Sequence, residues 1–492
     1  MSKIEYQKVW ESHVLPLLYA QWNLESNVVN LKKNLGVGYR NSIMVVKKLV
    51  VETFYSKKDM ERESRCGYKI FSTKRKAKKL LEKSERLSKK GLDFSTKLCN
   101  SDLSHLSYNE LFELFKKVYD WSKELFGLYN TTQPQCSELV EQELIKYLEK
   151  EKASDPTQAF LDLIAPSTTS LVKQTEIDWY NILISKKQEK VADYYKKYRF
   201  FGTEEGVKPK PLNYYVKQFK KEIKISKKEL NKKVCEIKKS LKQIKSNQSE
   251  LIKKYRIAEK IQDMTLAVQS FSHVRLKVRL AWVSVEWACR HLFKEVGKRY
   301  KINSVDLENY TKEEIIELFK QNKKVSPSLI KDRNKFFVAY LKDSKFNFLM
   351  GKKAENYIKT NDLYKKLATT ELKGHIANKG YAKGSVTVIN VELDILREMS
   401  KMKKGNILIA TQTKPVFIPA IKKASAIVTD EGGITSHAAI VSREFGIPCI
   451  TATHYATKVF KDGDYIEVNA NKGVVKKLTS GLNSASRLKR RA

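Results

Sequence analysis

Residues 426–450 read AIVTDEGGITSHAAIVSREFGIPCI, and this stretch decides the fold of the C-terminal part of the chain. It opens with an apolar run, Ala426–Val428, which predicts a short strand. The polar loop that follows contains two adjacent glycines, Gly432 and Gly433, which permit positive φ angles and a close approach of the backbone to a ligand. The pattern therefore predicts a strand that leads into a glycine-rich loop.

A helix is predicted directly after this loop. Thr435 and Ser436 are residue types that commonly cap helix N-termini, and residues 438–445 have helical spacing. Gly446 is expected to end the helix, because glycine readily takes the left-handed conformation found at helix C-termini. His437 is therefore expected in the first turn of this helix.

The first turn of a helix favours a bound anion. Its N–H groups have no partner within the helix, and the helix dipole adds about half a positive charge there. A phosphoryl group on His437 would lie among these donors, near the hydroxyls of Thr435 and Ser436, and Arg443 is expected to help neutralise an incoming phosphate. Because neutral imidazole is a nucleophile near pH 7, His437 is the candidate catalytic residue. The other three residues and the two loop glycines are candidates for supporting the phosphate.

The segment around His437 closely resembles the signature of the mobile, swivelling domain of PEP-utilising enzymes, a group that includes phosphoenolpyruvate synthase, pyruvate phosphate dikinase and rifampicin phosphotransferase. The resemblance continues through residues 374–389, 405–421 and 462–475. It implies an α/β swivelling domain in which His437 carries the phosphoryl group. One departure is the sequence TAT at residues 451–453, where the family usually has a Val-Gly-Thr-like sequence. The missing glycine is expected to restrict a loop.

The chain is expected to contain a mainly α region followed by this α/β domain. Glycine is sparse in the first 370 residues and frequent afterwards. We predict a helical domain at residues 1–369, the mobile phosphohistidine domain at residues 370–480 and a disordered basic tail at residues 481–492. A small β element is expected near residues 43–73, because Ile43–Tyr55 is rich in β-branched residues, although its periodicity does not exclude a helix.

The chain is strongly basic, with a formal net charge of +40 over 492 residues. Clustered Lys and Arg can bind nucleic acid, but most of the positive residues here are Lys, without one dominant block. We prefer the interpretation that lysine fills solvated helix faces, so nucleic acid is not expected as a partner. No apolar run approaches the roughly 18 residues of a membrane span, and the N-terminus lacks the pattern of a secretory signal. We expect a cytoplasmic protein without a membrane partner.

A charging partner is expected in trans. In the enzymes that the C-terminal domain resembles, an ATP-grasp unit commonly phosphorylates the histidine, but this chain contains no glycine-rich phosphate loop before residue 374. We therefore expect ATP and Mg on a separate ATP-grasp-type protein and no cofactor on this chain. The six cysteines form no CxxC pair, and none lies at metal-ligand spacing from a histidine, so no metal site is expected.

The helical region is expected to hold an anionic or small-molecule acceptor, or to bind a protein partner. It resembles the helical region of short prokaryotic proteins that end in this mobile domain, and by layout it resembles the acceptor-binding domain of rifampicin phosphotransferase. Arg275, Arg279 and Arg290 lie at near-helical spacing and are candidates for contacting an anionic acceptor, with a solvated or ion-paired basic face as the alternative.

The first hypothesis for function is a phosphotransferase component in which an ATP-binding partner phosphorylates His437. Two alternatives stay open. One is a non-catalytic interaction or regulatory protein that has retained the mobile-domain fold. The other is a basic nucleic-acid-associated protein.

Overall fold

The computed structural model describes residues 4–13, 15–47, 50–201, 209–364, 369–389, 395–413, 417–433 and 436–478. The chain divides into two compact units. The helical unit comprises His13–Val51 and Tyr55–Glu355, and the α/β unit comprises Met1–Ser12, Glu52–Phe54 and Asn356–Ala492. The α/β unit therefore takes in the whole of the segment predicted at residues 370–480, together with two N-terminal stretches.

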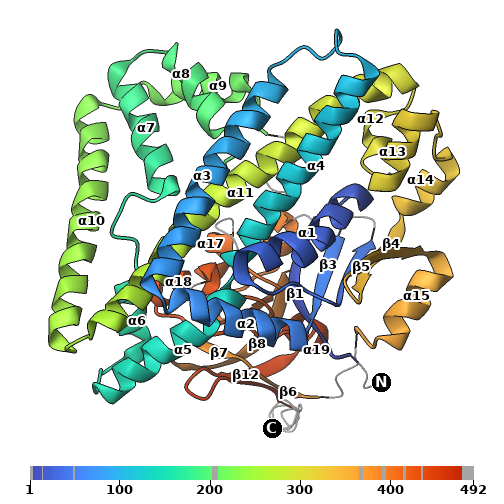
Figure 1. Ribbon diagram of the computed structural model, residues 1–492. Coiled ribbons are helices and arrows are strands. Elements are labelled where there is room, and N and C mark those ends of the chain that lie inside the picture. Colours follow the sequence, from blue (N-terminus) through green and yellow to red (C-terminus); the bar gives the residue numbers. More distant parts are fainter. Residues whose placement is uncertain are drawn as a thin grey trace, which may run out of the picture. The chain divides into compact units, whose positions relative to one another are not determined.

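The helical unit consists mainly of helices, in agreement with the fold class predicted from the sequence. Figure 1 shows α3, α4 and α11 running side by side, and α11 packs against both of the others. The helices of this unit are α1 (Leu17–Leu35), α2 (Lys57–Phe71), α3 (Lys74–Cys99), α4 (Tyr108–Thr131), α5 (Pro134–Lys150), α6 (Pro156–Ile164), α7 (Leu171–Ser185), α8 (Lys190–Tyr198), α9 (Leu212–Glu222), α10 (Lys227–Lys254), α11 (Glu259–Tyr300), α12 (Ser304–Leu307), α13 (Lys312–Gln321) and α14 (Pro327–Arg333).

The core of the helical unit is built around α11, a helix of 42 residues. The aromatic residues on its inner face, Phe271, Trp282 and Phe293, are all buried. The ring of Trp282 contacts those of Phe126 and Tyr129 on α4, with centroid distances of 4.9 and 5.4 Å. Offset and edge-to-face aromatic pairs of this kind add to the free energy gained from burial. The aromatic stripe on this helix therefore marks the core.

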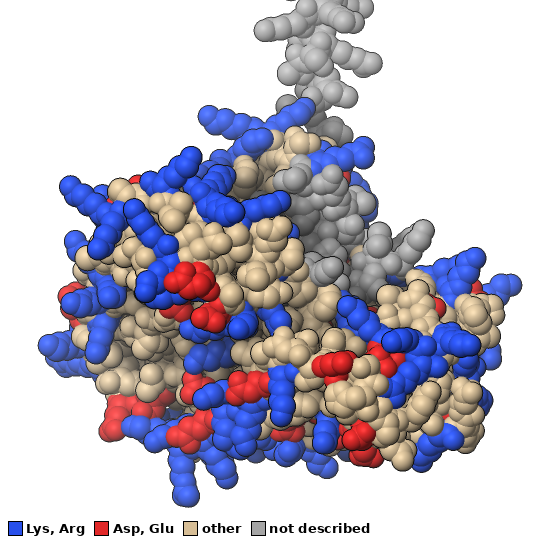
Figure 2. All heavy atoms as spheres, turned by 90° about the horizontal axis from the view of Figure 1, so that it is seen from above, with Lys and Arg blue, Asp and Glu red and all other residues tan. Residues whose placement is uncertain are grey.

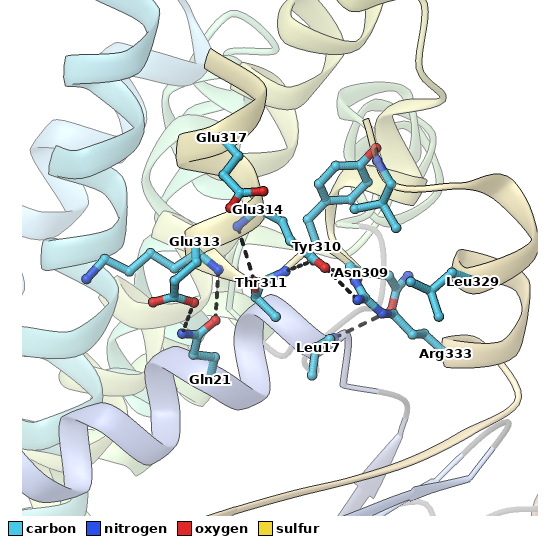
Figure 3. A network of polar contacts seen from close by, with 12 residues as sticks. Leu17, Gln21, Asn309, Tyr310, Thr311, Glu313, Glu314, Glu317, Leu329 and Arg333 are labelled. Carbon is cyan, nitrogen blue, oxygen red and sulfur yellow. Dashed lines mark hydrogen bonds and ion pairs between the residues drawn. The ribbon is translucent and has the colours of Figure 1, made fainter. Parts of the chain in front are cut away.

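A polar network fixes the N-terminus of α13 (Figure 3). The Thr311 side chain accepts a hydrogen bond from the Glu314 N–H, and the Glu314 carboxylate accepts one from the Thr311 N–H. This capping box follows from the Thr-x-x-Glu spacing. Arg333 donates two hydrogen bonds of 2.7 Å to the Glu314 carboxylate and one to the Asn309 carbonyl. Gln21 of α1 contacts the same turn, so the network joins three helices.

The helical unit also contains strands. The expected β element is confirmed as β2 (Ser42–Lys47) and β3 (Val50–Ser56), but it ends at Ser56 and the residues that follow form α2. β2 pairs antiparallel with β4 (Phe336–Lys342), which pairs antiparallel with β5 (Lys345–Met350). The β4–β5 hairpin was not predicted from the sequence, because its two turn residues, Asp343 and Ser344, adopt positive φ angles although neither is glycine.

The α/β unit is built on an eight-stranded sheet of order β6-β13-β12-β8-β9-β10-β11-β7, in which β8, β9, β10 and β11 are parallel. The unit also includes most of β1 (Tyr6–His13) and residues Glu52–Phe54 of β3. The strands of the sheet are β6 (Glu371–Lys373), β7 (His375–Asn378), β8 (Tyr381–Ile389), β9 (Ile407–Ala410), β10 (Ala426–Thr429), β11 (Cys449–Thr451), β12 (Tyr465–Asn469) and β13 (Val474–Lys477). The helices are α16 (Ile395–Ser400), α17 (Ile418–Ile421), α18 (His437–Glu444) and α19 (Ala456–Val459), and α15 (Gly351–Thr360) crosses the division between the units.

The central strands of this sheet are buried on both faces. Successive residues of a strand point to opposite faces, and in β9 the side chains of Leu408 and Ala410 join one buried cluster, whereas those of Ile407 and Ile409 join another. This explains why the strands predicted here are continuous apolar runs rather than alternating ones. Among the described residues, no helix combines the length and apolar character needed to cross a membrane.

A buried carboxyl in the helical unit gives a prediction about stability. Glu63 of α2 is 2% exposed and accepts hydrogen bonds from the Tyr39 hydroxyl and from the Cys136 thiol, the latter at 3.1 Å. Burial raises the pKa of Glu63 to about 7. Between pH 4.5 and 7 the folded protein therefore holds a proton that the unfolded chain releases, so the free energy of unfolding falls as the pH rises through this range.

Glu63→Gln is expected to remove this fall in the free energy of unfolding, which is on the order of 3 kcal/mol between pH 4.5 and 7. Urea unfolding at several pH values between 4.5 and 8 would measure it. Glu61→Gln, at an exposed position of the same helix, is the matched control and is expected to leave the pH dependence unchanged. An equal pH dependence in wild type and Glu63→Gln would contradict the assignment.

Candidate functional site

His437 is the first residue of α18, as expected. The residue before it, Ser436, is the N-cap, and its side chain accepts a hydrogen bond from the Ala439 N–H at 3.4 Å. The backbone N–H of Ser436 donates to the Gly433 carbonyl at 3.0 Å. These contacts close the loop after β10 and direct it into the helix. His437 therefore lies in the first turn of α18, whose N–H groups have no partner further back in the helix.

Gly432 is required by the shape of this loop. Its φ angle is +102°, and a Cβ at this position would lie 2.8 Å from Cβ and 3.0 Å from Oγ of Ser436. Any other residue would therefore push against the N-cap that precedes His437. Gly433 faces open space, and nothing lies within 4 Å of the position that its Cβ would take. Thr435, a further candidate for supporting a phosphate, lies outside the described residues.

One ring nitrogen of His437 is held by a residue that the sequence analysis did not identify. Thr413 Oγ1 lies 2.9 Å from His437 Nδ1, and Thr413 is almost fully buried. Thr413 follows β9, whereas His437 follows the neighbouring parallel strand, β10. Loops at the carboxyl ends of adjacent parallel strands meet at one edge of a sheet, and this topological rule is the signal that could have found Thr413.

The contact with Thr413 engages Nδ1 of His437, and the tautomer of the ring sets which of the two groups donates. A neutral imidazole carries one proton, on either Nδ1 or Nε2. When Nδ1–H donates to the Thr413 hydroxyl oxygen, the lone pair is on Nε2. The arrangement therefore favours nucleophilic attack through Nε2.

Arg443 lies in the last turn of α18, six residues beyond His437 and about 9 Å further along the helix axis. Its Nε donates a hydrogen bond of 2.9 Å to the carbonyl of Ala377 in β7. Arg443 therefore ties the end of the helix to the sheet, and this contact does not bring it to the imidazole.

The end of β10 is anchored by a buried aspartate. Asp430 is 1% exposed, and its Oδ1 accepts a hydrogen bond of 3.1 Å from the N–H of Thr457. The Thr453 hydroxyl donates to the Thr429 carbonyl at 2.9 Å. Burial raises the pKa of Asp430, and the hydrogen bonds to Thr457 act in the opposite direction. These contacts fix the start of the loop that carries His437 against the segment that follows β11.

The departure from the family sequence at residues 451–453 lies in this anchoring segment. Ala452 has a φ of 56°, in the left-handed region that favours glycine. We therefore expect Ala452→Gly to raise the free energy of unfolding by about 0.5–1 kcal/mol by relieving this strain. Thermal or urea unfolding would measure the change, with Ala456→Gly in α19 as a control that should destabilise. A loss of stability in Ala452→Gly would contradict the prediction.

The three candidate arginines of α11 belong to the helical unit. Arg275 donates to Gln133 Oε1 at 2.7 Å. Arg290 forms a two-point contact with Glu308, with Nε–Oε1 and Nη2–Oε2 distances of 2.8 and 3.1 Å, and it lies 4.8 Å from the ring centroid of Trp287. Arg275 thus contacts an uncharged amide, and Arg290 forms an ion pair within the helical unit. Arg279 lies on the same helix.

The basic residues do not form one block on the face that Figure 2 shows. Figure 2 shows Lys and Arg side chains over the whole of the face in view, with Asp and Glu side chains among them. In α10, a helix of 28 residues, Leu230 and Ile237 are buried, and the lysines lie on the remaining surface. In the described part of the chain, no three His, Cys, Asp or Glu side chains are grouped so that they could hold a metal ion.

Comparison with known families identifies the segment that contains this site. Residues 402–473 match the family model of the PEP-utilising enzyme mobile domain. The matched segment takes in Thr413, the loop after β10 and the whole of α18. The C-terminal region is thus similar to this mobile domain, as the motif around His437 predicted.

Curated relatives align over the same region. A probable phosphoenolpyruvate synthase of Archaeoglobus fulgidus is 53% identical over 104 residues, which are 21% of this chain and 13% of that protein. The phosphoenolpyruvate synthase of Pyrococcus furiosus is 53% identical over 106 residues, which are 22% of this chain and 12% of that protein. The chain therefore spans only a small part of the length of these relatives. A crystal structure of Thermococcus kodakaraensis aconitase X in its holo form aligns with 22% of this chain and 98% of its own, at 21% identity and a TM-score of 0.17.

Proposed function

We propose that this chain is a phosphotransferase component in which His437 is transiently phosphorylated and then passes the phosphoryl group to an acceptor. One observation carries the proposal. His437 begins α18 with its Nδ1 held by Thr413, inside a segment that matches the mobile domain of PEP-utilising enzymes. The alternative of a non-catalytic interaction protein offers no reason for this arrangement of imidazole, hydroxyl and helix N-terminus.

The charging step proceeds through Nε2 of His437. In the tautomer with the proton on Nδ1, this nitrogen donates to Thr413 Oγ1, 2.9 Å away, and the Nε2 lone pair attacks the phosphorus of the donor phosphate. An N–P bond forms, the P–O bond to the leaving group breaks, and its electron pair stays on the leaving oxygen. The ring keeps its Nδ1 proton and therefore becomes a positively charged imidazolium. In the discharging step an acceptor oxygen attacks the same phosphorus and loses its proton to solvent. The N–P bond then breaks, and its electron pair returns to Nε2.

The start of α18 stabilises the charge of the bound phosphoryl group. The first-turn N–H groups and the helix dipole favour an anion at this position. The Ser436 oxygen already accepts from Ala439, so its hydroxyl hydrogen can donate to a phosphoryl oxygen. Gly432 keeps the loop close enough to Ser436 for this geometry. The backbone donors and the Ser436 hydroxyl are thus proposed to support the phosphoryl group, and Thr435 and Arg443 stay candidates for the same role.

The remaining parts of the reaction belong to other molecules or to the helical unit. The relatives from Archaeoglobus fulgidus and Pyrococcus furiosus are named as a probable phosphoenolpyruvate synthase and a phosphoenolpyruvate synthase. The chain covers 13% and 12% of their lengths. We propose that an ATP-grasp-type protein binds ATP and Mg and charges His437 in trans. The helical unit would hold the anionic or small-molecule acceptor. We place the chain in the cytoplasm, where ATP is available.

The test is phosphorylation of the full-length chain. The chain is incubated with candidate ATP-grasp proteins and with ATP labelled at either the β or the γ phosphate. Label that is acid-labile and base-stable supports a phosphohistidine, and the labelled position shows whether AMP or ADP leaves. If no ATP-grasp protein of the same cell transfers label from either phosphate, the proposal fails.

A further inference from the structure

Strand β1 places two charged side chains inside the α/β unit. Lys8 and Glu11 are 6% and 8% exposed, and a lysine is almost never buried without a partner. The Lys8 ammonium hydrogen-bonds the Glu11 carboxylate and donates to Oε1 of the buried Glu52 at 3.0 Å. Burial alone would lower the pKa of Lys8, but Glu52 and Glu11 raise it above its usual value. Lys8 is therefore a fixed, buried positive charge.

The same strand contacts loops at the carboxyl ends of two strands of the parallel sheet. After β9, the Thr411 hydroxyl donates to Glu11 Oε1 at 3.5 Å, and Gln412 Nε2 donates to the Glu11 carbonyl at 3.4 Å. After β11, His454 Nε2 lies 3.3 Å from Gln7 Nε2. These two loops flank the one that follows β10 and carries the phosphorylation site. β1 therefore lies along the edge of the sheet that builds this site.

Thr411 connects β1 with the loop that leads to His437 and with Thr413, whose hydroxyl contacts the imidazole. Its carbonyl accepts a hydrogen bond of 2.8 Å from the Glu431 N–H, at the start of the loop that leads to His437. Two residues after Thr411, the hydroxyl of Thr413 meets His437 Nδ1. A displacement of Thr411 would thus move the Thr413 hydroxyl and the histidine loop together. Glu11 is the side chain of β1 that contacts Thr411.

The positive charge of Lys8 also acts on the carboxylates of Glu11, Glu52 and Glu431. Glu431 experiences the charges of Lys8, Glu11 and Glu52, and burial raises its pKa to about 8. Within the described residues, Glu431 Oε1 is buried without a hydrogen-bond partner. A phosphoryl group on His437 would bring further negative charge to this loop. Without Lys8, Glu11 and Glu52 would lose the ammonium group that both of them contact.

We propose that Lys8 and Glu11 are positioning residues for His437, so that the N-terminal strand β1 is a functional part of the phosphohistidine carrier. The inference rests on the proposed function, in which His437 reacts through Nε2. Glu11 fixes Thr411 and thereby the Thr413–His437 contact, and Lys8 holds Glu11 and neutralises the carboxylates beside it. A carrier made of residues 370–480 alone would lack this support.

Two readouts on the full-length chain test this proposal. Two-bond ¹H–¹⁵N spectra of protein labelled at its seven histidines report the tautomer of His437 without any partner. Phosphorylation by the ATP-grasp partner reports kcat and KM. We expect Glu11→Gln and Lys8→Met to lower the fraction of the Nδ1–H tautomer. We also expect both variants to lower kcat by roughly 10-fold while KM changes less than twofold.

The controls separate positioning from folding. Lys458→Met removes another ammonium, which lies 3.6 Å from Glu52 and is 53% exposed, and it is expected to leave both readouts unchanged. If a β1 variant does not fold, Thr411→Val removes the link to Glu11 while the ion cluster stays intact, and the same changes are expected. Folded Glu11→Gln, Lys8→Met and Thr411→Val proteins with the wild-type tautomer would overturn the proposal. If wild type is never phosphorylated, the proposed function fails. The tautomer measurement alone then decides whether β1 determines the tautomer of His437.

Discussion

Replacement of His437 by alanine is expected to abolish phosphoryl transfer by this chain. The proposed intermediate is an N–P bond to an imidazole nitrogen, and alanine offers no atom that could form one. The loss should therefore be complete rather than partial, and it should not depend on the concentration of the charging partner. Measurement of acid-labile label per mole of chain gives the result directly.

The matched control for this substitution is His375→Ala. His375 lies in β7 of the same unit, is exposed, and is not part of the site. It should keep the wild-type level of label and the wild-type stability. Thermal unfolding of His437→Ala should also remain close to wild type, because alanine is a good helix former at this position. Label that persists in a folded His437→Ala protein would contradict the assignment of the nucleophile.

Thr413→Val is expected to lower the rate of phosphorylation of His437 by about 100-fold, which corresponds to about 2.7 kcal/mol in the barrier. Valine has nearly the shape of threonine but cannot hydrogen-bond the imidazole. Without the contact at 2.9 Å, the Nδ1 proton is no longer stabilised, and the ring loses both its preferred tautomer and its orientation. Single-turnover phosphorylation of the full-length chain measures the effect.

Thr413→Ser is the matched control, because it retains the hydroxyl and removes only a methyl group. It should recover most of the wild-type rate, and the pH at which the rate is half-maximal should shift in Thr413→Val but not in Thr413→Ser. Equal rates for the valine variant and wild type would show that the imidazole does not need this hydrogen bond.

The sequence allowed the chemical centre of the α/β unit to be predicted because that centre is local. The strand, the loop glycines, the N-cap Ser436 and His437 all lie within about a dozen residues, and their spacing indicates a strand–loop–helix element. Gly432 could be predicted as a required glycine, and its φ of +102° agrees. The capping boxes at Ser107 and Thr311 were predictable for the same reason.

Contacts between distant parts of the sequence could not be predicted in this way. Thr413 precedes His437 by 24 residues and reaches it only because β9 and β10 are parallel neighbours. Glu11 meets Thr411 across 400 residues, and no local pattern links a strand near the N-terminus with a loop near the C-terminus.

Arg443 shows what helical spacing leaves open about the partner of a side chain. Helical spacing places it roughly on the face of Ser436, but it lies in the last turn of a short helix and donates to the carbonyl of Ala377 in β7. A helix wheel gives the face of a residue but not the end of the helix at which its side chain finds a partner. The candidate arginines of α11 show a similar limit, because spacing does not reveal that Arg290 faces Glu308.

The central claim is that His437 carries a phosphoryl group on Nε2. The most direct measurement is NMR of the phosphorylated full-length chain, labelled with ¹⁵N at histidine, in which coupling to ³¹P identifies the bonded nitrogen. We expect a single phosphorylated histidine, His437, with phosphorus bonded to Nε2 and, in the imidazolium form of the ring, the proton on Nδ1 next to Thr413. Phosphorus bonded to Nδ1 of His437, or to another residue, would contradict it.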